Sequence, residues 1–90
     1  MRFTWRPEKN RINVRRHGIA FQDAARIFDG PTVERVDDRF DYGETRHIAF
    51  GFINNRLSVC VYTDHDNERR IISQRKANSR EVKRYGEKFE

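Results

Sequence analysis

Ninety residues are enough for one domain with a modest core, but a chain of this length buries only about 60–65% of its unfolded surface, which argues against a deep internal active site. Nineteen Lys and Arg against fourteen Asp and Glu give a net charge of +5, so a polyanion is a natural partner, although a merely solubilising surface gives the same count. No apolar run has transmembrane length and the first residues do not form a signal peptide, so we expect a cytoplasmic protein with a single domain over residues 1–90.

The first predicted elements are a short strand and a basic helix. The segment Phe3-Thr4-Trp5 alternates like a strand. Pro7 suits the first turn of a helix, because the N–H that proline lacks would have no partner there, and Gly18 is typical of a helix end. We therefore expect a helix from about Pro7 to His17. Its apolar stripe is thin, and basic residues cover most of its circumference.

A second helix follows, and it is predicted to pack on the core. Phe21, Ala24, Ala25 and Phe28 recur at the spacing of one helical face. Gly30-Pro31 ends the pattern. Two aromatic side chains on that face indicate a core contact.

The pattern then changes to the alternation of strands. Residues 32–36 read as a strand, and the polar stretch 37–43 reads as a loop. In the strand that follows, Ile48, Phe50 and Phe52 share one face, which we expect to be the apolar face.

Two more strands complete a meander. Asn54 and Asn55 tolerate positive φ and predict a hairpin turn, after which alternate residues from 57 to 61 form the apolar face of the partner strand. Residues 63–67 are rich in Asp and Asn and predict a second turn, and residues 69–73 predict the next strand.

The last element is a helix that starts near Ser79. Asn78 and Glu81 have the spacing of a capping box, in which each side chain takes a backbone N–H of the other residue. Val82 and Tyr85 are its expected core contacts. The predicted fold is therefore α+β: a small antiparallel meander sheet with two N-terminal helices and one C-terminal helix packed against it.

Cysteine and histidine give little sign of other chemistry. Cys60 is alone, so it forms no internal disulfide, and its apolar strand predicts a buried, unreactive thiol. His47 and His65 have no third ligand at metal spacing, so we expect no metal site and no cofactor. His17 precedes the capping Gly18, where a histidine interacts well with the helix dipole, and we interpret it as structural.

Several ordered motifs run through the whole chain. The first half carries Trp5 before a helix with Lys9 and Asn13, then His17-Gly18-Ile19-x-Phe21. The second half carries Tyr42-Gly43-Glu44-x-Arg46, Val61-Tyr62-Thr63, and Arg70-Ile71-Ile72-Ser73-x-Arg75-Lys76-Ala77 before a helix with Glu81 and Tyr85. Together these motifs resemble the BrnT toxins. The resemblance covers essentially the whole chain, and ordered motifs with the expected spacers are far more specific than one short pattern.

The resemblance implies a RelE-like fold and an endoribonuclease that works without metal and arrests translation and growth. It also implies neutralisation by a cognate BrnA-like antitoxin, with operator DNA bound only by the complex of the two proteins. Two positions depart from the pattern. His65 stands where relatives often carry an arginine, which would weaken a phosphate contact, and Ala20 replaces a helix-capping Ser or Thr, which costs about 1 kcal/mol.

Metal-independent RNA cleavage needs a base for the 2′-hydroxyl, cations for the charge on phosphorus, and an acid for the leaving 5′-oxygen. An antiparallel meander could bring Arg46, Arg70 and Arg75 to one patch, and the resemblance favours them as the groups that stabilise the scissile phosphate. Lys9 or Glu44 would then handle the 2′-hydroxyl proton. A carboxylate among arginines keeps its charge, so Glu44 is better suited to orienting Arg46.

Four further residues are candidates for binding RNA. Lys76 and Arg69 would contact phosphates, and Tyr62 and Trp5 would stack on bases, although aromatic residues beside a small core more often belong to it. Two other functions stay open: a basic module that binds nucleic acid without cleaving it, and a protein-interaction module whose charge only keeps it soluble. RNA cleavage in EDTA that an arginine variant loses would distinguish the toxin from both.

Overall fold

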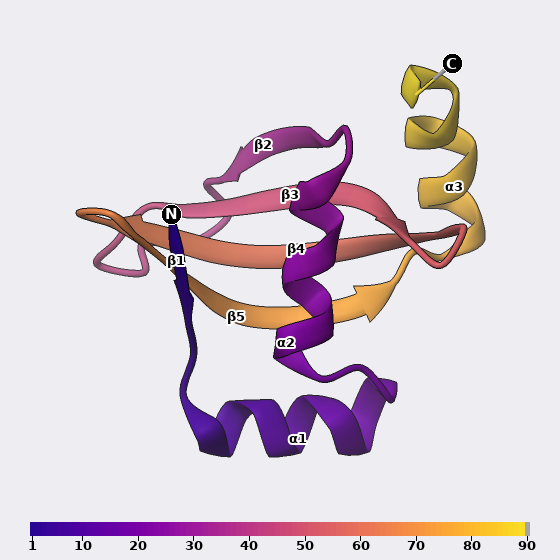
Figure 1. Cartoon of the computed structure of the whole chain (residues 1–90). Coiled ribbons are helices and arrows are strands. Elements are labelled where there is room, and N and C mark those ends of the chain that lie inside the picture. The colour runs from indigo at the N-terminus through magenta and orange to yellow at the C-terminus, as the bar shows by residue number, and fades with distance from the viewer. Residues whose placement is uncertain (90) are drawn as a thin grey trace.

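The computed structural model describes residues 1–89, which form an α+β fold around a five-stranded sheet (Figure 1). The strand order is β1-β5-β4-β3-β2. The elements in chain order are β1 (Arg2–Thr4), α1 (Pro7–His17), α2 (Phe21–Ala24), η1 (Ala25–Asp29), β2 (Val33–Asp37), β3 (Arg46–Ile53), β4 (Arg56–His65), β5 (Glu68–Lys76), α3 (Ser79–Tyr85) and η2 (Gly86–Phe89). No helix among these residues is both long enough and apolar enough to span a membrane.

Local signals in the sequence fix both ends of α1. Pro7 is the first helical residue, and Gly18 at the other end has a φ of 71°, in the left-handed region where glycine is favoured. The backbone N–H of Gly18 donates to the carbonyl of Val14 at 2.8 Å. The predicted bounds of this helix are confirmed.

The second helix is shorter than predicted. Only α2 is α-helical, and the chain then tightens into the 3₁₀ turn η1. Ala20 lies at the N-cap of α2 and provides no side-chain cap, because its methyl group cannot accept a hydrogen bond. Asn10 of α1 replaces that cap, because its Oδ1 accepts the backbone N–H of Phe21 at 2.8 Å.

The sheet is mixed, which corrects the prediction of a purely antiparallel one. Strands β2 to β5 form the predicted antiparallel neighbours, and Asn54 and Asn55 make the β3–β4 turn with φ values of 50° and 62°. β1, however, pairs parallel to β5, with Arg2 opposite Glu68. Alternation within a strand records which side chains share a face but not the direction of the neighbouring strand, so the sequence pattern could not show this pairing.

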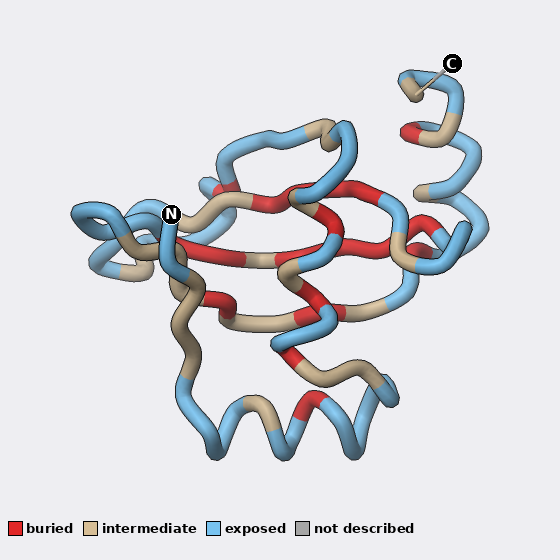
Figure 2. The backbone as a smooth tube through the Cα atoms, in the orientation of Figure 1, coloured by how far each residue is buried: buried red, intermediate tan, exposed pale blue. Residues whose placement is uncertain are grey.

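Both faces of the sheet are buried, where one apolar face was predicted. Ala49 and Cys60 belong to a core under α2 and η1, and the alternate residues Phe50 and Val59 belong to a second core with α3. The C-terminal helix therefore covers the face opposite to α2. Figure 2 shows buried residues along the central strands and in the helices on both faces of the sheet.

A single asparagine holds α1 against the outer edge of β5. Asn13 is the one buried residue of this helix. Its Oδ1 accepts the backbone N–H of Gln74 at 3.1 Å, and its Nδ2 donates to the carbonyls of Gln74 and Ile19, both at 2.9 Å. The side chain thus satisfies backbone groups that a neighbouring strand would otherwise pair, and α1 continues the sheet edge where β1 ends.

Candidate active site

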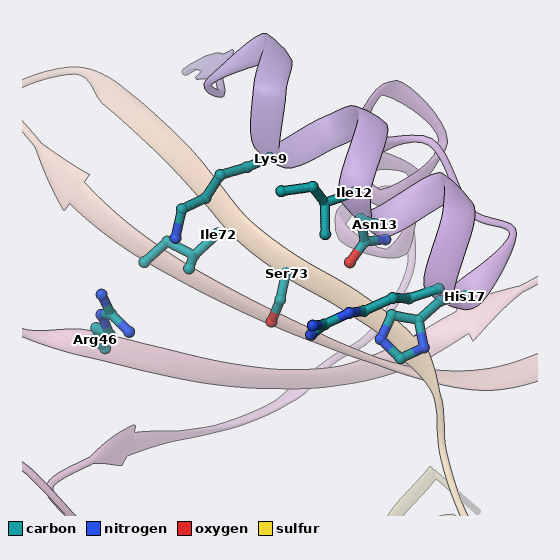
Figure 3. A pocket seen from close by; sticks show the side chains of 8 residues that line it. Lys9, Ile12, Asn13, His17, Arg46, Ile72 and Ser73 are labelled. Atoms are coloured by element: carbon teal, nitrogen blue, oxygen red, sulfur yellow. The ribbon is translucent and has the colours of Figure 1, made fainter.

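A cavity of about 420 Å³ opens between α1 and the neighbouring strands (Figure 3). Its lining is cationic and polar, with two aliphatic side chains, and no carboxylate contributes to it. We call it the main cavity of the candidate site; it is lined by Lys9, Ile12, Asn13, Arg16, His17, Arg46, Ile72 and Ser73. Because α1 contributes five of these eight residues, the Asn13 contact with β5 also determines the shape of the cavity. A larger cavity of about 550 Å³ lies where β4 ends and β5 begins, and Arg46 does not line it.

Arg46 is the cation of this cavity that comes from the sheet. It starts β3 and shares the face of Ile48. Its guanidinium lies 4.0 Å from the centre of the Tyr42 ring, a distance at which a cation is attracted to the ring face. No carboxylate of residues 1–89 forms an ion pair with it, and its buried Nε has no hydrogen-bond partner among them. The positive charge is therefore free to meet an anionic ligand.

A buried carboxylate in turn holds the aromatic ring. The Tyr42 hydroxyl donates to Oδ2 of Asp37 at 3.1 Å, and Arg39 binds both oxygens of Asp37 at 2.8 and 2.9 Å. These hydrogen bonds, the one from Arg39 above all, hold the pKa of Asp37 well below its usual range. A chain of contacts from Asp37 through Tyr42 thus fixes the position of Arg46.

A smaller cavity of about 110 Å³ adjoins the first and shares Lys9, Arg46 and Ile72 with it. We call it the side cavity; it is lined by Arg6, Lys9, Glu44, Arg46, Arg70, Ile71 and Ile72. Arg70 donates to both oxygens of Glu44 at 2.9 and 3.0 Å. Four of the five residues predicted to be catalytic, Lys9, Glu44, Arg46 and Arg70, therefore lie together. Glu44, which was expected to orient Arg46, instead binds Arg70.

Residues 5–81 match the model of a known protein family. That family is described as the ribonuclease toxin, BrnT, of type II toxin-antitoxin system. The chain belongs to the BrnT family. The matched range includes every residue that lines the two cavities of this toxin. Membership of a type II toxin-antitoxin family gives the protein the role of a toxin and implies an antitoxin as its partner.

A solved structure supports the BrnT fold. The chain is similar to the 1.1 Å crystal structure of the Brucella abortus ribonuclease toxin BrnT, with a TM-score of 0.68 and 22% sequence identity. The similarity covers 88% of this chain and 99% of the other. At this identity the likeness concerns the fold. No curated protein matches the sequence.

The remaining predicted catalytic residue of the toxin, Arg75, lies outside both cavities. Both of its terminal nitrogens donate to Glu81, at 2.7 and 2.8 Å, and this pairing raises the pKa of Arg75. Arg75 lies five residues beyond Arg70 on β5, about 16 Å along the strand. The predicted convergence of three arginines thus holds for Arg46 and Arg70 only, because Arg75 is committed to the α3 cap.

The residues predicted to bind RNA do not gather at the cavities either. Tyr62 is only 3% exposed, its hydroxyl donates to Glu34, and the Arg69 guanidinium lies 4.1 Å from its ring centre, so the ring cannot stack on a base. Burial raises the pKa of Tyr62. Arg69 is held by Asp64 on the face covered by α2, Trp5 packs against the core there, and Lys76 ends β5. These placements make structural roles the better interpretation of Tyr62, Trp5 and Arg69.

The sequence interpretation missed three basic cavity residues on or beside α1: Arg6, Arg16 and His17. A signal was present, because Lys9, Asn13 and Arg16 recur at the 0, 4, 7 spacing of one helical face. A search for apolar stripes passes over such a polar face. His17 was interpreted as a structural helix end, yet it also lines the main cavity.

The other nucleophilic and metal-binding side chains lie elsewhere. Cys60 is fully buried, which confirms the prediction of a buried thiol, and burial raises its pKa to about 12. The His47 ring stacks on Tyr62 at 5.1 Å between centres, and His65 lies beside Asp66 with a side chain that is 90% exposed. Across residues 1–89, no group of three or more His, Cys, Asp and Glu is arranged to hold a metal ion.

Proposed function

We propose that this BrnT toxin cleaves RNA at the two adjoining cavities, with Arg46 as the group that binds the scissile phosphate. The observation that carries the proposal is the state of Arg46: it is held against Tyr42, lines both cavities, and has no carboxylate partner in the described chain. An arginine fork suits phosphate, and a guanidinium already in position strengthens its bonds as charge develops in the transition state.

The surrounding side chains supply the other requirements. Lys9 and Arg16 add positive charge on the α1 side, and Arg70 adds it on the β5 side. Because Glu44 is occupied at both oxygens by Arg70, Lys9 is the better of the two groups first considered for proton transfer. These side-chain cations stabilise the negative charge of the transition state, which a metal ion stabilises in other nucleases. We therefore infer that cleavage is independent of metal.

We infer two further partners from membership of the family. A BrnA-like antitoxin neutralises the toxin by binding it, and the complex, rather than the toxin alone, binds operator DNA. In the cell, RNA cleavage by the free toxin arrests translation and growth.

The test is cleavage of single-stranded RNA by the purified chain in EDTA. We expect the wild-type chain to cleave and Arg46→Ala to lose about 100-fold or more of its rate, because that loss is typical when a transition-state donor is removed. Arg56→Ala is the matched control, since Arg56 is an exposed arginine in the β3–β4 hairpin, outside both cavities. RNA binding without cleavage by the wild-type chain would overturn the proposal and favour a non-enzymatic binding module.

A further inference from the structure

We propose that His17 is a catalytic residue that takes the proton of the ribose 2′-hydroxyl, with Lys9 donating a proton to the leaving 5′-oxygen. This inference rests on the proposed RNA cleavage and adds the proton carrier that arginines cannot provide. Guanidinium groups stay charged at all relevant pH values, so Arg46, Arg16 and Arg70 can stabilise charge but cannot exchange protons.

Position singles out His17 among the three histidines. Imidazole is the side chain that ordinarily changes charge near neutral pH, and it is the commonest acid–base group in catalysis. His47 lies stacked on Tyr62, and the exposed His65 ends β4 and lines a separate cavity that does not include Arg46. Only His17 lines a cavity together with Arg46.

Figure 3 shows Lys9 and His17 at opposite ends of the main cavity, with Ser73 between them. Eight residues along α1 correspond to a rise of about 12 Å, and both side chains point into the space beside the sheet. In-line cleavage requires the base and the acid on opposite sides of the phosphorus, so two groups at the two ends of the main cavity fit the reaction better than two neighbours would.

The charged groups that face His17 are all cationic. Lys9 and Arg16 come from α1 and Arg46 comes from β3, while β5 contributes the neutral Ser73 and Ile72. No carboxylate lines the main cavity, so His17 has no acidic partner there that would occupy its ring nitrogens. Among residues 1–89, the one carboxylate that lines either of these two cavities, Glu44, belongs to the side cavity and is bound to Arg70.

The step balances without a further reactant. The neutral imidazole of His17 takes the 2′-hydroxyl proton, the 2′-oxygen forms a bond to phosphorus, and the bond from phosphorus to the 5′-oxygen breaks. The Lys9 ammonium gives its proton to the 5′-oxygen. The products are a 2′,3′-cyclic phosphate and a free 5′-hydroxyl, and exchange with solvent restores both side chains.

The experiment measures cleavage of a single-stranded RNA oligonucleotide by the full chain at saturating enzyme, between about pH 5 and 9, where imidazole titrates. For His17→Ala we expect a rate lower by about 100-fold or more, loss of the acidic limb of the wild-type pH profile, and partial rescue by added imidazole. Affinity for an uncleavable 2′-deoxy analogue should stay within about threefold of wild type. Arg56→Ala, at an exposed position outside both cavities, should keep both the rate and the acidic limb.

A purely structural role of His17 at the end of α1 predicts otherwise: a lower melting temperature, no rescue by imidazole and an unchanged pH profile. That result, or a His17→Ala rate within about threefold of wild type, overturns the inference. If Arg46→Ala is inactive while His17→Ala is not, the assignment of His17 fails and the proposed function stands. A wild-type chain that cleaves no RNA overturns both.

Discussion

Three arginines of the sheet differ in what holds them, and this difference separates their roles. Arg70 and Arg75 each donate two hydrogen bonds to a carboxylate, whereas Arg46 lies on an aromatic ring. For Arg70 and Arg75, the ion pair with the carboxylate would have to break before a phosphate could bind both terminal nitrogens of the guanidinium. The ring of Tyr42 positions Arg46 without neutralising it.

Tyr42 is therefore expected to act through Arg46. In Tyr42→Leu we expect RNA cleavage to fall by about 10-fold, because a partly buried cation–π contact contributes about 1–2 kcal/mol. Tyr42→Phe keeps the ring and loses only the hydrogen bond to Asp37, so it should retain most of the activity. Cleavage rates of both variants, measured at saturating RNA, check this. Equal losses in the two variants would show that the hydroxyl, and not the ring, holds Arg46.

Gly51 is required by close packing. A Cβ at this position would lie 3.0 Å from Cβ of Ile27 and 3.3 Å from the carbonyl oxygen of Ile27, and Ile27 is fully buried. We expect Gly51→Ala to lower the free energy of unfolding by about 1–3 kcal/mol, as overpacking of a core does. Urea unfolding measures the loss. Gly30→Ala is the control, because a Cβ there meets no atom within 4 Å, and a similar loss in that variant would contradict the explanation.

At the level of single residues, the sequence predicted part of the site. Lys9, Glu44, Arg46 and Arg70 could be chosen from charge and motif, and the structure brings them together. The pairing of Arg75 with Glu81 could not be predicted, because the spacing of Glu81 from Asn78 already explained Glu81 as part of the helix cap. Periodicity shows where apolar residues recur, so it gave no reason to assign polar cavity residues such as His17 to a site.

Among the elements, those with local signals formed as predicted. The proline and glycine at the ends of α1, the two asparagines of the β3–β4 turn and the capping box of α3 each act within a few residues. The shortening of α2 to four residues had no such signal, because its apolar spacing continues through η1. Tertiary packing against the sheet decides how that segment winds.

The attachment of α1 depends on Asn13, because this helix has a thin apolar face. Asn13→Ala leaves the buried N–H and C=O of Gln74 without partners, and we expect a loss of about 2–4 kcal/mol in unfolding free energy. Hydrogen exchange of the Gln74 amide should accelerate far more than that of the other β5 amides. Arg15→Ala, on an exposed position of the same helix, should change neither quantity. Unchanged exchange at Gln74 in Asn13→Ala would show that α1 is held in another way.

The cap of α3 makes stability depend on pH. Hydrogen bonds from Arg75, with a further one from the Asn78 backbone, lower the pKa of Glu81 from its ordinary value of 4.5. A group whose pKa is lower in the folded state stabilises the fold above its unfolded pKa and loses that contribution as pH falls through the folded one. We therefore expect the stability of the wild-type chain to fall as pH drops below about 4.5.

Glu81→Gln should be less stable than wild type by about 1–2 kcal/mol at neutral pH, and this gap should narrow in acid. The variant keeps part of the acid dependence, since the pKa values of Asp37 and Asp64 are also lowered by their arginine partners. Urea unfolding of both proteins across this pH range gives the comparison. The exposed Glu87→Gln serves as control, and a gap between wild type and Glu81→Gln that stays constant with pH would rule out the Glu81 contribution.

Over the whole molecule, topology was the part that sequence patterns could not supply. The parallel pairing of β1 with β5 joins Arg2–Thr4 to residues 68–70, across most of the chain, and nothing in a local window encodes it. Burial of both sheet faces likewise depends on α3 returning to the side opposite to α2. These long-range choices create the space between α1 and the sheet in which the cationic residues meet.

The distribution of charge, more than the net charge of +5, should govern binding of RNA. Four cations line the two cavities without a carboxylate partner in residues 1–89: Arg6, Lys9, Arg16 and Arg46. For a single strand, each phosphate contact contributes about 0.7 to the magnitude of the slope of log affinity against log salt concentration. Four contacts predict a slope of about −3 for an uncleavable 2′-deoxy oligonucleotide. Arg46→Ala should make the slope shallower by about 0.7, and Arg56→Ala should leave it unchanged. Equal changes in the two variants would mean that RNA meets a diffuse positive surface, and the cavities would then have no special part in binding.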